Sequence, residues 1–99
     1  MVLADLNSYL RLSVQRALLG NLAPNIRAVV AKLSGKNIGL LFYFEGPVGD
    51  DDEELVSVIE TEVIADFDEN FIVDTTIQRL DYPQPINNTN GLLVYLRKE

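Results

Sequence analysis

The spacing of apolar residues changes along the chain, and these changes restrict the folds that the chain can adopt. In residues 3–18 and 50–67, apolar side chains recur every three or four positions, which predicts two amphipathic helices. Gly20 and Pro24 follow the first stripe, so the first helix should end just before them. Residues 25–33, 37–45, 71–80 and 91–98 are rich in β-branched, aliphatic and aromatic side chains and predict four strands. Residues 34–36 have the length of a hairpin turn, whereas the prolines and asparagines of residues 81–91 predict an irregular loop.

The predicted order of elements is α-β-β-α-β-β, which places the chain in the α+β class. A four-stranded, mainly antiparallel sheet with both helices packed on one face is the simplest arrangement that buries both helical stripes. We therefore expect a single domain over residues 1–99, with the order of the strands in the sheet left open. The helical residues expected in the core are Leu6, Leu10, Val14, Ile59, Val63 and Phe67.

The apolar run Leu40–Phe44 has two interpretations. It predicts either a central strand that is covered on both faces, or a strand with one exposed face that is used for contact. Coverage on both faces is the preferred interpretation, because most apolar runs of this length in small domains belong to the core.

Five consecutive acidic residues, Asp50–Glu54, precede the second helical stripe. The net charge is −7, and no lysine or arginine occurs between Asn37 and Gln78. Acids in the first turn of a helix stabilise its positive end, but helix capping does not explain five adjacent carboxylates that repel one another. We therefore predict that this region also binds a basic partner. The residues predicted to make the contact are Asp50, Asp51, Asp52, Glu53, Glu54, Glu60 and Glu62.

The missing residue types exclude most catalytic sites and metal centres. The chain has no histidine and no cysteine, hence no imidazole base, no thiolate nucleophile and no ordinary zinc site. The alternating acids that begin at Asp66 lack the turn glycine and the closing glutamate of a calcium loop. A carboxylate pair such as Glu60 with Glu62 is the catalytic alternative, although such pairs on a helix more often form a solvated face. We predict a protein that is not an enzyme and that binds no metal or cofactor.

Charge and the N-terminal sequence restrict the partner and the location. A negative surface repels phosphate, so direct binding of nucleic acid is not expected. Polar and charged residues interrupt the first 20 positions, so neither a signal peptide nor a membrane span is predicted. These observations favour a cytoplasmic protein that binds another protein.

Three segments carry a resemblance to a known group of proteins. They are SYLRLSVQRALLGNLAPNIRAV at 8–29, TEVIADF at 61–67 and IQRLDYPQPI at 77–86. In this order they resemble small bacterial immunity proteins of contact-dependent growth inhibition and related polymorphic toxin systems. The resemblance implies a cytoplasmic antitoxin that binds the C-terminal toxin domain of a cell-surface protein, often a nuclease, and blocks its active site. It assigns no residue roles, so the predicted contact residues rest on charge alone.

Two functional hypotheses follow. In the first, the acidic residues occupy the basic groove of a nuclease toxin and neutralise it. In the second, the chain is a non-enzymatic interaction or self-assembly module without a toxin partner. Leu12 and Leu19, near Tyr9 and Arg16, lie opposite the core stripe of the first helix and would then form a dimer face, so a homo-oligomer is left open.

Overall fold

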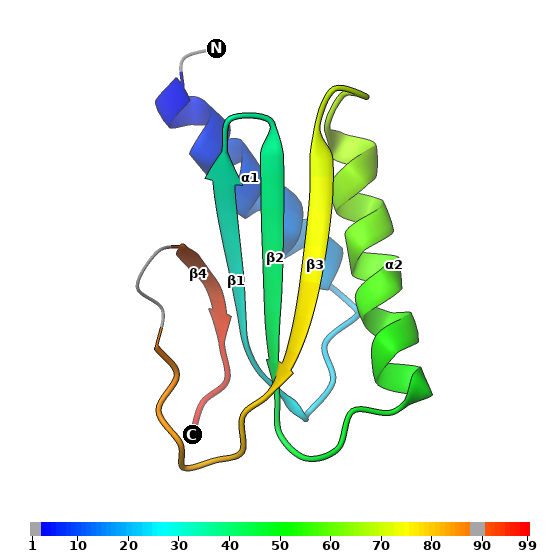
Figure 1. Ribbon diagram of the computed structural model, residues 1–99, viewed down its shortest axis with the longest axis vertical. Helices are drawn as coiled ribbons and strands as arrows, with labels where there is room; N and C mark the ends of the chain where they lie inside the picture. The colour runs from blue at the N-terminus through cyan, green and yellow to red at the C-terminus, as the bar shows by residue number, and fades with distance from the viewer. Residues whose placement is uncertain (1–2, 88–90) are drawn as a thin grey trace.

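The helices and strands follow one another in the predicted order (Figure 1). The computed structural model describes residues 3–87 and 91–99, so residues 88–90 of the predicted loop lie outside the described part. The elements are α1 (Leu3–Leu18), β1 (Ile26–Ser34), β2 (Asn37–Phe44), α2 (Asp50–Asp66), β3 (Ile72–Arg79) and β4 (Leu92–Leu96). The α+β class and the α-β-β-α-β-β order are therefore confirmed.

The four strands form one mixed sheet in the order β3-β2-β1-β4. β1 is antiparallel to both β2 and β4, whereas β2 and β3 are parallel. The β1–β2 hairpin turns at Gly35, whose φ of 61° favours glycine. The parallel pair arises because α2 connects β2 to β3 as a crossover helix, which returns the chain to the same end of the sheet. The sheet is mainly antiparallel, as predicted.

Both helices cover one face of the sheet and enclose the main core (Figure 1). Leu10, Val14, Ile59 and Val63 are buried there, as predicted. Phe67 is half-buried and packs against this core. The prediction for Leu6 was wrong: it is half-buried and lies outside the buried core, near the N-terminal end of α1. The inner face of β2 supplies Ile38, Leu40, Phe42 and Phe44.

The opposite face of the sheet, which we call the outer face, carries a smaller apolar cluster. Ala28, Val30 and Tyr43 are buried in it, and Leu80 and Ile86 pack over them. Coverage of both faces of the apolar run on β2 is thus confirmed at its C-terminal end. Toward the middle of β2, around Gly39 and Leu41, the outer face is open.

A buried arginine joins β1 to the C-terminal residues. A β-bulge in β1 lies between Ile26 and Ala28, at Arg27, whose side chain is only 2% exposed. The Arg27 guanidinium donates to both carboxylate oxygens of Glu99, at 2.7 and 2.9 Å, and to the carbonyl oxygen of Leu80 at 2.6 Å. The hydrogen bond with Glu99 raises the pKa of Arg27, and the same contact holds the pKa of Glu99 below its usual value.

Candidate partner-binding surface

The predicted contact residues all belong to α2, which begins within the acidic run. Gly49 is the N-cap residue, and its backbone N–H donates to the Asp52 carboxylate at 3.0 Å. The side chain of Asn25 donates to the other oxygen of Asp52 at 2.9 Å. The hydrogen bond from Asn25, and next that from Gly49, lowers the pKa of Asp52. Asp52 thus caps the helix and ties it to the segment before β1.

We expect Asp52→Ala to destabilise the fold by about 1 kcal/mol, because it removes an acceptor from an N-cap N–H group. Thermal unfolding at neutral pH measures this loss. Folding lowers the pKa of Asp52, so the ionised carboxylate contributes its full stabilisation above the unfolded pKa of about 3.9. This stabilisation is lost as pH falls from that value through the lower pKa of the folded state. The control is Asp51→Ala, which changes an exposed carboxylate of the same turn. Equal losses for the two variants would contradict the capping role.

Glu60 and Glu62 lie further along α2 and also have partners within the chain. Thr75 of β3 donates its hydroxyl hydrogen to the half-buried Glu60, and Asn21 donates to Glu62 at 3.0 Å. The two carboxylates therefore point to different neighbours, one toward the sheet and the other toward the segment after α1. Glu60 and Glu62 therefore do not face each other as a carboxylate pair. Within the described residues no group of His, Cys, Asp or Glu side chains could hold a metal ion.

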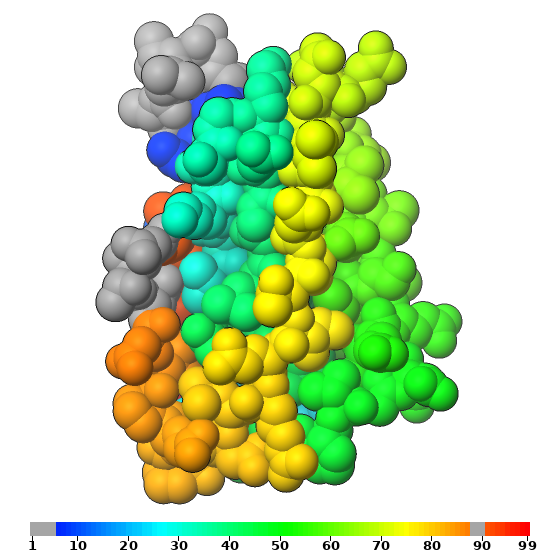
Figure 2. Space-filling model, viewed as in Figure 1, coloured from blue at the N-terminus to red at the C-terminus, as the bar shows by residue number. Residues whose placement is uncertain are grey.

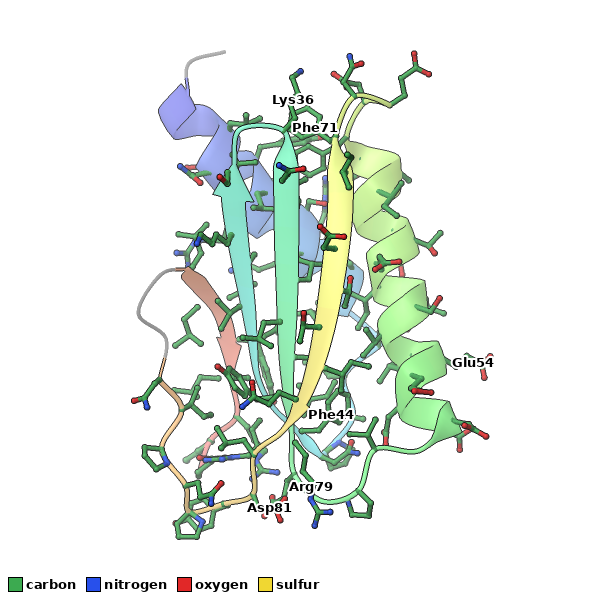
Figure 3. All side chains as sticks on the ribbon, viewed as in Figure 1. Lys36, Phe44, Glu54, Phe71, Arg79 and Asp81 are labelled. Carbon is green, nitrogen blue, oxygen red and sulfur yellow. The ribbon has the colours of Figure 1, made fainter. Side chains whose placement is uncertain are left out.

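The remaining four carboxylates form the exposed N-terminal end of α2, which we call the acidic edge: Asp50, Asp51, Glu53 and Glu54. Their side chains make no ion pair or hydrogen bond with the described part of the chain. Figure 3 shows Glu54 projecting from α2 away from the sheet. The acidic edge can therefore act on a partner through unneutralised negative charge.

Basic side chains near α2 form ion pairs away from the acidic edge. Arg79 pairs with Asp81 at 3.1 Å, a contact that lowers the pKa of Asp81, and Figure 3 shows the pair at the end of β3. Arg16 of α1 approaches Asp66 at the C-terminal end of α2, at 3.4 Å. The described ion pairs thus leave the charge of the acidic edge uncompensated. In the sequence, this excess of negative charge was indicated by the absence of lysine and arginine from Asn37 to Gln78.

The fold and this surface define a small α+β domain whose distinctive feature is a set of exposed carboxylates at one end of a helix. The family profile described as "MafI2 immunity protein" matches residues 7–99, and the chain belongs to the MafI2 immunity protein family. No curated protein matches the chain. Family membership confirms the predicted relation to the immunity proteins of polymorphic toxin systems and gives the chain an antitoxin role with a cognate toxin as its partner.

No helix in residues 3–87 and 91–99 combines the length and the apolar character needed to cross a membrane.

Proposed function

We propose that the protein neutralises a nuclease toxin domain by placing the acidic edge in the basic groove that binds phosphate. The observation that carries this proposal is that the four carboxylates of the acidic edge are exposed and have no partner among the described residues. A nuclease must attract a polyanion, so its active site is basic and complementary to such an edge. Occlusion would take place in the cytoplasm, where a delivered nuclease meets its substrate.

Electrostatic attraction suits the task of an antitoxin. Exposed charges act across about 8 to 10 Å at physiological ionic strength, and complementary fields raise association rates by roughly 10- to 1,000-fold. A toxin that enters the cell would thus be captured before it damages its target. The acidic edge contributes mainly to the association rate, whereas buried contacts set the dissociation rate.

The test replaces Asp50 and Asp51 by asparagine and Glu53 and Glu54 by glutamine in one variant. We expect at least a tenfold slower association with the cognate toxin domain, and a weaker dependence of this rate on salt. Stability should change by about 1 kcal/mol or less, because the loss of favourable charge at the helix start is partly offset by relief of repulsion. Surface plasmon resonance over a range of salt concentrations measures the rate.

The matched control uses both ends of α2. Asp51→Asn with Glu54→Gln removes two charges from the acidic edge, and Asp68→Asn with Glu69→Gln removes the same two charges from the exposed loop after the helix. Only the first pair should slow association. Equal rates for the two pairs would show that net charge, rather than the acidic edge, attracts the toxin.

The alternative function as a self-assembly module has one supporting observation. Leu12 of α1 and Leu19, the residue that follows α1, are 49% and 76% exposed and lie outside the core. A dimer formed through these residues would give a molecular mass that rises with concentration and falls after Leu19→Ser. A constant monomer mass would exclude this alternative.

A further inference from the structure

A hollow of about 470 Å³ opens on the outer face of the sheet, which Figure 2 shows from the front. Neither helix covers this face. Asn87 lines one side of the hollow, and β3 lines the other side with Asp74, Thr76 and Gln78. The floor is formed by the middle of β2 and its two neighbouring strands.

The strand register arranges the lining of the hollow in rows. Lys32 of β1, Gly39 of β2 and Asp74 of β3 are direct neighbours across the sheet. Two positions further along β2, the next row consists of Val30, Leu41 and Thr76. Because strands lie about 4.8 Å apart, the backbones at the two charged ends of the first row are separated by roughly 10 Å. The hollow is thus a slot with an apolar side, a base at one end and an acid at the other.

Gly39 is unusual at the centre of a sheet, where glycine weakens a strand by roughly 0.5 to 1 kcal/mol relative to alanine. Its φ is not positive, and the register around it is regular on both sides, so neither a turn nor a bulge requires it. An added Cβ would meet nothing closer than Lys32, at 4.0 Å. Among the described residues, therefore, nothing needs the missing side chain. The other common reason for glycine in a strand is the close approach of a binding partner.

The charges of the slot would orient a charged guest. Lys32 and Asp74 are exposed, and neither forms an ion pair with the described residues. A cationic side chain would be attracted to Asp74 and repelled by Lys32, so it would enter in one orientation only. The aliphatic stem of a lysine or arginine would pack against Leu41 and Val30. Thr76 and Gln78 supply further acceptors along β3.

We propose that this hollow receives an arginine or lysine side chain of the cognate toxin domain, with its charged end at Asp74 and its stem above Gly39. The inference rests on the proposed function, which supplies a basic protein partner. β3 lies between β2, which supplies the middle of the floor of the hollow, and α2, which carries the acidic edge (Figure 1). A standard interface covers roughly 800 Å² of each partner and can span one strand, so a single toxin domain can contact both.

The first experiment fills the slot from inside the sheet. Gly39→Val should leave Tm unchanged or raise it, because valine favours strands and its Cβ would meet only Lys32, at an ordinary contact distance of 4.0 Å. The same change should weaken binding of the inactivated cognate toxin domain by at least tenfold, mainly through faster dissociation. Gly39→Ala should give a smaller loss in the same direction. Undiminished binding by a folded Gly39→Val variant would overturn the proposal.

The second experiment removes the charge at the acidic end of the slot. Asp74→Asn should accelerate dissociation of the toxin domain at least fivefold, whereas Asp68→Asn, the same change in an exposed loop, should not. Lys32→Gln should not weaken binding, because the lysine only repels the guest. Equal effects of the two aspartate variants would contradict a specific contact at Asp74.

The third experiment uses the absence of cysteine from the chain. Single cysteines at Thr76 in the hollow and at Gln15 on α1 are alkylated with and without the inactivated toxin domain. Protection at position 76 alone supports docking on the outer face, and protection at position 15 alone overturns it. This result can be distinguished from failure of the proposed function. If the toxin domain protects position 76 but associates at a normal rate with the variant that lacks the charges of the acidic edge, only the electrostatic mechanism is contradicted.

Discussion

Ile59→Asp should abolish the folded state. Ile59 is completely buried between α2 and the sheet, in the core that also contains Val56 and Val63. An aspartate there leaves a carboxylate without solvent or a basic partner and removes the apolar contacts of the isoleucine, at a cost of about 4 kcal/mol or more. Domains of this size are stable by roughly 5 to 10 kcal/mol, so most or all of the stability would be lost. Circular dichroism during thermal unfolding provides the measurement.

The adjacent residue is a matched control. Val58 lies on the same turn of α2 but is 43% exposed, so Val58→Asp places the same charge in water. We expect a shift in Tm of only a few degrees for this variant, mostly from repulsion between the new carboxylate and Glu54 and Glu62, four positions away on the helix. If both variants melted at similar temperatures, the burial of Ile59 and the orientation of α2 would both be wrong.

The elements of this fold were predictable because their signals are local. Leu10 and Val14, like Ile59 and Val63, repeat at helical spacing, and such spacing depends only on near neighbours in the sequence. The order β3-β2-β1-β4 was not predictable in the same way. It depends on which strands pair after the α2 crossover, and several pairings would bury the same apolar faces.

Some features of the acidic run follow from its own sequence, whereas others depend on residues far away in the chain. Its position at the start of α2 follows from the sequence, and so does its excess of charge. The separate role of Asp52 depends on Asn25, which lies 27 positions earlier in the chain. The partners of Glu60 and Glu62 likewise come from other elements. Charge alone could therefore not divide the predicted contact residues into capping, packing and exposed groups.

One residue in the sequence, Gly39, indicates the hollow on the outer face. Gly39 interrupts the apolar residues of β2 without any turn residue beside it, and an isolated glycine in a strand often marks a close approach. Its neighbours Lys32 and Asp74 could not be assigned without the register of three strands. The site therefore required the structure.

Arg27→Met should destabilise the fold by about 3 kcal/mol. The substitution retains much of the apolar volume but breaks both hydrogen bonds to Glu99 and leaves the carbonyl oxygen of Leu80 without its donor. For a domain of this size, such a loss corresponds to a fall in Tm of roughly 12 to 24 °C. Arg79→Met is the control, because Arg79 forms an exposed pair with Asp81 and should matter little.

The pH dependence identifies the carboxylate that compensates Arg27. The hydrogen bond from Arg27 lowers the pKa of Glu99 on folding, so its stabilising contribution is complete above the unfolded pKa of about 4.3 and is lost as pH falls through the lower folded value. Glu99→Gln removes this charge and leaves the buried guanidinium with weaker acceptors. The difference in Tm between the wild-type protein and Glu99→Gln should therefore be largest near neutral pH and shrink progressively below pH 4. A difference that is constant between pH 3 and 7 would mean that Arg27 is compensated by another carboxylate, with Glu45, which accepts a hydrogen bond from Arg97 at 2.6 Å, as the next residue to replace.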